Sequence, residues 1–237
     1  MKVTPLTTKV FPENGDLVSF ITEHIKRVSE GAVIVVTSKI VALSEGRTVI
    51  AHTDKEKEKI IRAESELVIK TKYVFLTVKD GTVLANAGVD ESNADGEGKI
   101  ILLPKDSYVS AEVLRKKLMK YYGVKKLGVL ITDSRILPLR AGVVGVALGY
   151  AGFKGLRDYR GTKDIFGRKL KMTQTDIADG LATAAVLVMG EGKECQPLAV
   201  ITEAPITYTN KVDRKELWID PKEDMYGPFF SRKTGKK

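Results

Sequence analysis

The sequence has little cysteine and histidine and no long apolar run. One of its 237 residues is cysteine, Cys195, and two are histidines, His24 and His52. A single cysteine excludes a disulfide within the chain and a cysteine-based metal cluster. Neither histidine has a Cys, Asp or Ser partner at a spacing typical of a nucleophilic triad. No run approaches the roughly 20 apolar residues of a membrane helix, and the N-terminal MKVTPLTTKVF lacks the apolar core of a signal peptide. We therefore expect a soluble, cytoplasmic protein that does not rely on a Ser, Cys or His nucleophile.

Acidic residues are outnumbered by basic ones. Lys and Arg total 39 against 30 Asp and Glu, a formal net charge of +9. This excess favours anionic partners, which include nucleotides, other polyanionic small molecules and nucleic acid. Many of the basic residues lie in helical patterns such as DKEKEKIIRAE (54–64), where they are expected to face solvent. Aromatic residues interleaved with basic ones, as base stacking requires, occur only in spots such as KYYGVKK (120–126). Nucleic-acid binding is therefore the less favoured alternative.

Apolar periodicity predicts a mixed α+β fold in which strands and helices alternate irregularly. Asp80-Gly81 separates two β-rich runs and predicts a hairpin, because this pair accepts the positive φ of a type I′ turn. Helices are expected at 15–31, 54–68, 107–123 and 175–189, and further strands near the N-terminus and at 32–39, 99–104, 127–135 and 197–205. The strand at 32–39 is expected to open into a loop, and that at 127–135 to break at Asp133. The glycine-rich stretch 142–161 is expected to serve close backbone packing and tight turns. We expect one catalytic unit over 1–229, which can consist of two interlocked subdomains, and a loose basic tail at 230–237.

The stretch LANAGVDESNADG (84–96) follows the hairpin and is dense in acidic and amide side chains. It does not fit a calcium-binding EF-hand loop. With Gly96 as the sixth residue, the twelfth is Leu102, where a bidentate Glu is required. A phosphate-binding loop is also excluded, since GEGKI and GEGKE lack both the upstream Gly and the final Ser or Thr. The function of this stretch must therefore be sought elsewhere.

Three carboxylates stand where ordered elements are expected to end. Asp90 follows the hairpin, Asp133 follows the apolar run LGVLIT, and Glu191 follows the long helix that ends near residue 189. Carboxylates held at the ends of rigid elements suit hard cations such as Mg²⁺ or Mn²⁺. Helix caps and turn residues show the same spacing. The pattern alone leaves both interpretations open.

Five stretches resemble the coenzyme F420-0:L-glutamate ligase (gamma-glutamyl ligase) family. They are VVTSKIVALSEGR (35–47), ANAGVDESN (85–93), VLITDS (129–134), DYRGTKDIFGR (158–168) and ADGLATAAVLVMGE (178–191). They follow the order found in that family and cover most of the chain up to about Pro205. The resemblance implies an F420-0:gamma-glutamyl ligase-like α+β fold assembled as an intertwined homodimer.

The resemblance also implies the reaction and its site. GTP would phosphorylate the carboxylate of an F420-0 or folate-type acceptor, and the α-amine of L-glutamate would displace phosphate from the resulting acyl phosphate. Two Mg²⁺ or Mn²⁺ ions, with K⁺ as an option, would be held by Asp90, Asp133, Ser134 and Glu191. The nucleotide site would comprise Val10, Phe11, Ser38, Lys39, Asn93 and the backbone of Met189, Gly190, Gly192 and Lys193. Arg140, Arg160 and Lys163 are expected, from their charge, to hold acceptor or glutamate carboxylates, the alternative being surface or dimer salt bridges.

The sequence departs from the family pattern at three places. Leu43 stands where members often carry a lysine that reaches the nucleotide, RILPLR (135–140) replaces an aromatic, Gly and Arg-containing segment, and VITEAP (200–205) replaces an Arg-Gly ending. The last two changes resemble a bacterial subgroup associated with glutamylation of folate. The acceptor therefore stays open between F420-0 and a folate. Leu43 favours the alternative of a nucleotide-binding family member without ligase activity.

Overall fold

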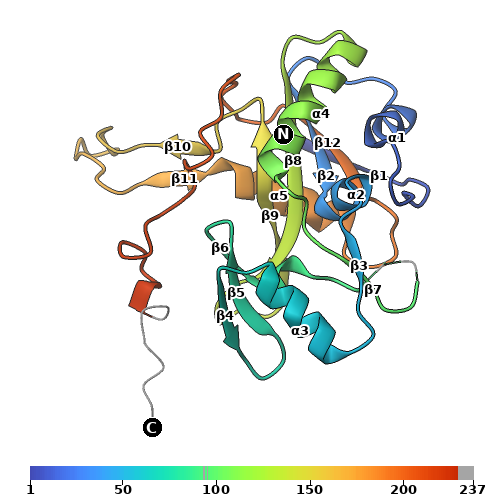
Figure 1. Ribbon diagram of the computed structural model, residues 1–237. Coiled ribbons are helices and arrows are strands. Elements are labelled where there is room, and N and C mark those ends of the chain that lie inside the picture. The colour runs from blue at the N-terminus through green and yellow to red at the C-terminus, as the bar shows by residue number, and fades with distance from the viewer. Residues whose placement is uncertain (93, 95, 229–237) are drawn as a thin grey trace.

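A five-stranded mixed sheet forms the centre of the molecule (Figure 1). The computed structural model describes residues 1–92, 94 and 96–228. The strand order is β1 (Lys2–Leu6), β12 (Leu198–Thr202), β2 (Ala32–Thr37), β8 (Leu127–Ile136) and β9 (Val143–Ala151). Strands β2 and β8 are parallel, whereas the other neighbouring pairs in this sheet are antiparallel. The expected mixed α+β class is confirmed.

Helices cover both faces of this sheet because its central strands are apolar on both sides. Side chains of a strand alternate between faces, and β2 shows this directly. Ile34 and Val36 belong to one apolar cluster, whereas Val33 and Val35 belong to another. The first cluster includes side chains of α1 (Leu17–His24), α2 (Ser38–Ser44) and α4 (Ser107–Tyr122), and the second includes those of α5 (Ile177–Met189). The main sheet is thus the middle layer of three.

A smaller β-rich region lies below the main sheet in the view of Figure 1. It contains an antiparallel sheet of β4 (Leu67–Lys70), β5 (Phe75–Lys79) and β6 (Thr82–Ala85), the pair β3 (Thr48–Ile50) and β7 (Lys99–Ile101), and helix α3 (Asp54–Ala63). Its own apolar cluster includes Ile61, Ile100 and Leu102. Asp80 and Gly81, between β5 and β6, have φ of 50° and 68°, which confirms the expected hairpin turn.

Two predicted helices are too long. Asp16 caps α1 as expected, but the helix ends at His24 instead of near Gly31. The carbonyl of Ile25 accepts a hydrogen bond from the Tyr122 hydroxyl at 2.5 Å, which ties the chain to α4. The second predicted helix, 54–68, ends at Ala63, because residues 67–70 pair with β5 as strand β4.

Two further predictions are wrong where tertiary pairing decides the structure. The chain after β2 enters helix α2 directly and forms no loop. Strand β8 does not break at Asp133, because β9 continues to pair with it from Asp133 opposite Val146 to Ile136 opposite Val143. Asp133 and the residues after it are therefore held in a sheet, and their side chains alternate between its faces.

The β8–β9 pairing contains one irregularity. Ile131 lies opposite Gly149 and Thr132 lies opposite Ala147, so Leu148 is an extra residue in β9, a β-bulge. The glycines of β9 allow close packing, as the sequence predicts. A Cβ atom on Gly145 would lie 2.5 Å from the Ala182 carbonyl oxygen, and one on Gly149 would lie 2.4 Å from the Ser107 backbone.

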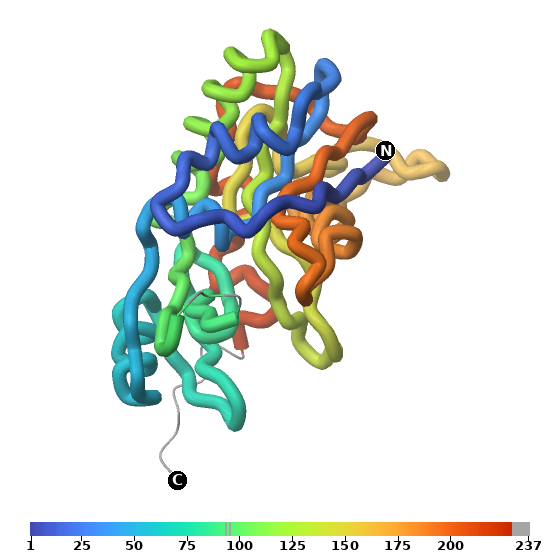
Figure 2. The backbone as a smooth tube through the Cα atoms, turned by 90° about the vertical axis from the view of Figure 1, so that its right-hand side faces the viewer, coloured from blue at the N-terminus to red at the C-terminus, as the bar shows by residue number. Residues whose placement is uncertain are grey.

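Two segments extend from this body. Figures 1 and 2, which differ by a quarter turn, both show an arm formed by β10 (Leu156–Asp158), β11 (Gln174–Asp176) and the residues between them standing clear of the main sheet. The chain after β12 is attached to the body through Asn210, which accepts a hydrogen bond from Arg115, and Glu216, which accepts one from Tyr150. The predicted tail at 230–237 lies outside the described residues. Within the described part of the chain, no helix has the length and apolar character needed to cross a membrane.

Candidate functional site

The first two residues of α2 link two distant parts of the chain. The Ser38 hydroxyl donates a hydrogen bond to Asp133 Oδ1 at 3.2 Å. The Lys39 ammonium lies 2.8 Å from Asp90 Oδ2 and donates to the Ser92 hydroxyl at 2.9 Å. Residues 38 and 39 therefore join strand β8 of the main sheet to the loop that follows β6. Four residues singled out by the sequence are brought together here.

The backbone of Asp90 is fixed by a bridge to β7. Its N–H donates to the Ile101 carbonyl at 3.1 Å, and the Ile101 N–H donates back at 2.9 Å. The Ser92 N–H donates to Asp90 Oδ1 at 2.7 Å. Burial raises the pKa of Asp90, but the Lys39 ammonium and the Ser92 N–H outweigh it, so the pKa lies below its ordinary value. Asp90 is therefore a carboxylate at neutral pH.

Asp133 and Ser134 are neighbours in β8, and their side chains leave the strand on opposite sides. Asp133 faces Ser38 of α2, whereas the Ser134 hydroxyl donates a short hydrogen bond to the Glu191 carboxylate after α5. Burial raises the pKa of Asp133 to about 6, although the Ser134 N–H and the Ser38 hydroxyl lower it. Strand β8 thus connects the α2 side of the sheet to the α5 side.

Two of the expected nucleotide-binding segments, the N-terminal one and the one after α5, are joined by a hydrogen bond. The N–H of Thr8 donates to the Cys195 carbonyl at 2.8 Å, which joins the N-terminal segment to the one after α5. Val10 is exposed, whereas Phe11 is buried edge-on against Phe20. The Met189 side chain is buried in the second apolar cluster, whereas Gly190, Glu191, Gly192 and Lys193 are exposed. The role of this backbone in nucleotide binding stays a prediction.

The donors at this site suit a hard divalent cation in their chemistry. Asp90, Asp133, Ser134 and Glu191 offer only oxygen atoms, which Mg²⁺ and Mn²⁺ prefer. These side chains do not form a ready-made metal cluster. Among residues 1–92, 94 and 96–228, no three Asp, Glu, His or Cys side chains lie close enough together to hold a metal ion. The Lys39 ammonium pairs with Asp90. A cation that binds Asp90 competes with Lys39 for the same carboxylate.

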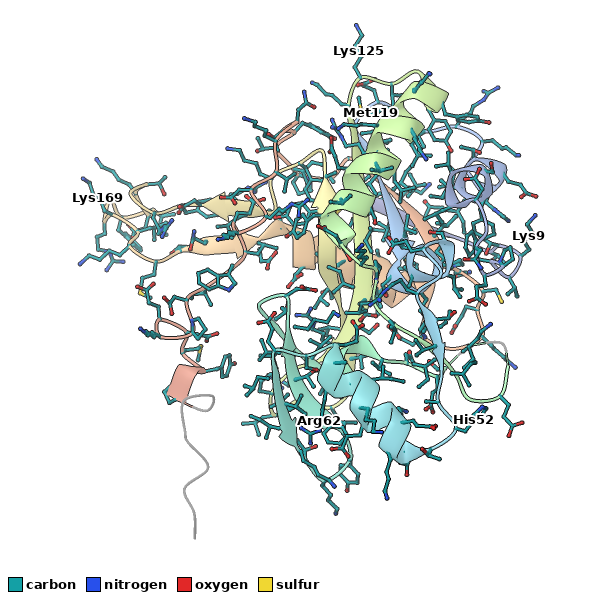
Figure 3. The ribbon with its side chains drawn as sticks, in the orientation of Figure 1. Lys9, His52, Arg62, Met119, Lys125 and Lys169 are labelled. Atoms are coloured by element: carbon teal, nitrogen blue, oxygen red, sulfur yellow. The ribbon has the colours of Figure 1, made fainter. Side chains whose placement is uncertain are left out.

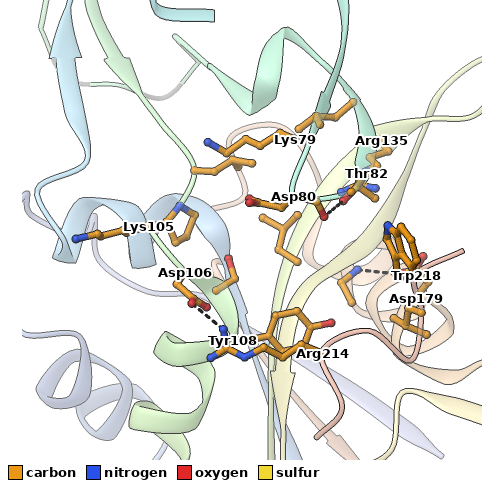
Figure 4. Close-up of a pocket in the computed structure, with 18 of the residues that line it drawn as sticks. Lys79, Asp80, Thr82, Lys105, Asp106, Tyr108, Arg135, Asp179, Arg214 and Trp218 are labelled. Carbon is orange, nitrogen blue, oxygen red and sulfur yellow. Dashed lines mark hydrogen bonds and ion pairs between the residues drawn. The ribbon is translucent and has the colours of Figure 1, made fainter. Parts of the chain in front are cut away.

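A cavity of about 360 Å³ lies beside β8 and β9 (Figure 4). Its wall comes from the β5–β6 turn, the starts of α4 and α5, both strands and the C-terminal segment, and it includes Asp80, Tyr108, Arg135, Asp176, Asp179 and Trp218. Sequence reasoning missed Arg135 because β8 was expected to end at Asp133. The signal that would have found it is the alternation of a strand: residues 133 and 135 share a face when the strand continues.

Comparison with known proteins identifies the family. The sequence model of the F420-0:Gamma-glutamyl ligase family matches residues 5–203. The chain belongs to this family. It is 38% identical to the coenzyme F420:L-glutamate ligase of Methanopyrus kandleri over 214 residues, which cover 83% of each chain. It is also 38% identical to the Methanocaldococcus jannaschii enzyme of that name over 90% of this chain and 84% of that protein. The Archaeoglobus fulgidus enzyme is 31% identical over 93% and 96%. The expectation of an enzyme of the gamma-glutamyl ligase class is confirmed.

The three basic residues that were expected, from their charge, to hold carboxylates in this gamma-glutamyl ligase lie apart from the linked set. Arg140 is exposed in the turn between β8 and β9. Arg160 forms an ion pair with Asp158 at 2.6 Å in the arm. Lys163 is paired through its backbone with Lys169, which Figure 3 labels at the far end of the arm. Their expected role in carboxylate binding stays a prediction.

Asn93 and Leu43 are the two other positions named from the family pattern. Asn93 lies outside the described residues. Leu43, at the position where family members often carry a lysine, packs against the first apolar cluster, and its carbonyl accepts a hydrogen bond from the Asn14 N–H at 2.9 Å. Its side chain therefore contributes to the core of this gamma-glutamyl ligase.

Proposed function

We propose that this protein joins L-glutamate to the carboxylate of coenzyme F420-0 through a γ-glutamyl amide bond, with GTP as the phosphate donor. The observation that carries the proposal is the linked set Ser38, Lys39, Asp90, Asp133, Ser134 and Glu191. It occurs in a chain that is 38% identical to proteins named coenzyme F420:L-glutamate ligase.

The reaction needs no protein nucleophile. A carboxylate oxygen of the acceptor attacks the γ-phosphorus of GTP, GDP leaves, and an acyl phosphate forms. The α-amine of glutamate then attacks the acyl carbon, phosphate leaves, and the amine loses a proton as the amide forms. Positioning and charge neutralisation dominate such phosphoryl transfers. The lack of a Ser, Cys or His triad in the sequence agrees with this chemistry.

The linked residues would divide the work of binding the phosphates. Asp90, Asp133, Ser134 and Glu191 would hold Mg²⁺ or Mn²⁺, which when bound neutralises phosphate charge and polarises the γ-phosphoryl group. Lys39, once released from Asp90, would donate its ammonium to a phosphate oxygen. Ser38 orients Asp133 through their hydrogen bond. The exposed backbone after α5 and the exposed Val10 region would line the rest of the nucleotide site.

Two acceptors are compatible with this reaction. The curated relatives favour F420-0, whereas the RILPLR segment beside Asp133 favours a folate. Purified protein incubated with GTP, Mn²⁺ and glutamate, with either F420-0 or tetrahydrofolate, will distinguish the two by mass spectrometry. We expect F420-0 to gain the mass of a glutamyl unit. The same gain on tetrahydrofolate alone would assign the folate activity, and no gain on either acceptor would refute the ligase proposal in both forms.

The same preparation tests the remaining expectations. GTP bound without turnover would indicate a nucleotide-binding member that lacks ligase activity. RNA binding that weakens steeply with salt, without metal-dependent GTP turnover, would favour the nucleic-acid alternative. Replacing K⁺ by Na⁺ in the assay tests for a monovalent ion. Light scattering on the eluting protein tests the proposed homodimer, for which a monomer mass would be the contrary result.

A further inference from the structure

The cavity beside β8 and β9 contains a cation that no side chain neutralises at contact distance. The Arg135 Nε atom is buried and has no hydrogen-bond partner. None of the ion pairs within 4.0 Å in the described part of the chain includes Arg135. A buried guanidinium is costly unless an anion or acceptor meets it. The cavity therefore offers a place for a negatively charged group of a ligand.

Two carboxylates at the start of α5, Asp176 and Asp179, line the same cavity as this cation. The Asp179 charge is the largest favourable influence on Arg135, ahead of Asp133, although it forms no ion pair with it. Asp176 Oδ1 accepts the Asp179 N–H at 2.9 Å, and Asp179 Oδ1 accepts the Ala147 N–H at 2.8 Å. The two side chains also interact with each other, and the Ala178 N–H reaches Asp176 as well. Partial burial raises the pKa of Asp176 to about 6, and the nearby Asp179 carboxylate adds to it. Two carboxylates this close favour a cation beside them.

Some of the other charged groups in the wall are paired, whereas Asp80 and Lys105 form no ion pair within 4.0 Å in the described part of the chain. Lys79 forms an ion pair with Glu64, and Arg214 forms one with Asp106 at 2.8 Å. Figure 4 shows Lys105 extending away from Arg135 and Asp179. The Arg135 guanidinium and the carboxylates of the Asp176–Asp179 pair and of Asp80 are therefore the charges that a ligand would meet near Arg135. This charge pattern is complementary to an α-amino acid, whose ammonium and carboxylate are adjacent groups of opposite charge.

The cavity and the candidate site share strand β8. Arg135 and Asp133 lie two residues apart in β8, on the same face and about 7 Å apart along the strand. The cavity therefore lies close along β8 to Asp133, which Ser38 holds, although Asp133 does not line it. The wall also contains Leu217 and Trp218, which lie beyond the matched residues 5–203. Glu216 anchors this segment by accepting hydrogen bonds from the Tyr150 hydroxyl and the Gly155 N–H, both at 2.7 Å.

We propose that this cavity is the binding site for free L-glutamate, with its α-carboxylate on Arg135 and its amino group on Asp176 and Asp179. The proposal rests on the ligase function proposed above and specifies where one of its substrates binds. The volume exceeds the needs of a single amino acid, so the end of the acceptor can enter beside it. Arg135 belongs to the segment that departs from the family pattern, and this assignment is specific to the present chain.

Calorimetric titration of the full-length protein with L-glutamate alone tests the proposal. We expect Arg135→Gln and Asp179→Asn each to weaken glutamate binding at least about tenfold, because each removes one charge-assisted contact. Arg135→Lys should recover part of the affinity. Asn at position 179 can still accept the Ala147 N–H through its amide oxygen. Arg27→Gln, an exposed arginine after α1, is the matched control and should bind as the wild type does. Circular dichroism and thermal melts check that each variant is folded.

The outcomes separate this inference from the ligase proposal. Unchanged glutamate affinity in both Arg135→Gln and Asp179→Asn, or no binding by the wild type at millimolar glutamate, would overturn it. So would loss of acceptor binding in Arg135→Gln with glutamate binding intact, which would assign the cavity to the acceptor. Glutamate binding that depends on Arg135, without amide formation, would refute the ligase function and leave the site. Amide formation by Arg135→Gln with an unchanged KM for glutamate would refute the glutamate site on Arg135 and leave the ligase function standing.

Discussion

The main sheet and the smaller β-rich region stabilise their parts of the candidate site in different ways. The sheet is buried between two apolar clusters, and central residues such as Ile34 and Leu130 are fully inaccessible. The smaller region has one modest cluster and is reinforced by charges: Glu64 with Arg47 and Lys79, Glu91 with Lys57, and Glu13 with Lys99. Asp133, Ser134 and Glu191 come from the first, and Asp90 from the second. The site therefore joins a half held by apolar packing to a half in which partly buried ion pairs supplement a smaller apolar cluster.

The largest expected effect is the loss of turnover on removing the negative charge of Asp90, which the smaller region contributes to the site. Asp90→Asn keeps an oxygen for the Ser92 N–H but loses the negative charge, and turnover should fall more than about 100-fold, since even indirect supports of metal ligands cost 10–100-fold. The assay with GTP, Mn²⁺ and glutamate measures this. Glu91→Gln, one residue on, is the control and should keep most of the activity. A fully active Asp90→Asn enzyme would remove Asp90 from the proposed metal ligands.

A large-to-small substitution in the main sheet and one in the smaller region should distinguish a loss of global stability from a loss of local stability. Leu130→Ala in the main sheet and Ile61→Ala in α3 each remove a buried side chain, at a cost of about 2–5 kcal/mol. We expect Leu130→Ala to lower the unfolding free energy of the whole protein. Ile61→Ala should mainly accelerate amide exchange in α3 and in the β4–β6 sheet. Uniform loss of protection across both regions in Ile61→Ala would show that they unfold as one unit.

The pKa of Asp176 predicts a pH-dependent cost to stability. Its folded-state pKa of about 6 exceeds the ordinary 3.8, so the folded protein binds this proton more tightly than the unfolded chain. The contribution to stability is present at low pH and is lost as pH rises through about 6. Asp176→Asn keeps a good helix cap and should be more stable than the wild type at about pH 8, with little difference at about pH 4. Denaturant titrations measure this, and equal stability of the two proteins at both pH values would contradict it.

The smallest effect is expected at the Lys57–Glu91 ion pair, which lies 2.7 Å apart and ties the loop after β6 to α3. Lys57→Met should cost less than about 1 kcal/mol, because exposed pairs contribute little. Added salt should reduce the difference between variant and wild type. Thermal melts at low and high ionic strength measure it, with Arg62→Met, which breaks another pair on the same helix, as the control. A larger loss that salt does not change would mean that packing, and not charge, fixes this loop.

Local sequence patterns correctly predicted helix ends and turns, because these depend on residues that are close together in the chain. Asp16 and Gly123 bound helices where expected, and Asp80-Gly81 forms the hairpin turn. The errors occur where pairing partners far along the chain decide the structure. Leu67–Lys70 follows a charged helical pattern, yet it pairs with β5, and β8 continues past Asp133 because β9 lies beside it.

The candidate site was predictable to the extent that its residues stand at the ends of regular elements. Asp90 and Glu191 follow that rule, and the family resemblance added Ser38, Lys39 and Ser134. Their contacts with one another were not predictable from spacing, since Ser38 and Asp133 are 95 positions apart. The cavity was missed for the same reason, because its wall draws on segments from the β5–β6 turn to Trp218.

The extra residue Leu148 in β9 has a consequence for how this site can change. Beyond the bulge, Asp133 and Arg135 face one side of β8 and Ser134 the other, and one inserted or deleted residue would exchange those sides for every position that follows. Segment 132–147 can therefore accept new side chains more readily than a new length. Natural or engineered variants that alter the acceptor should substitute residues here and conserve their number.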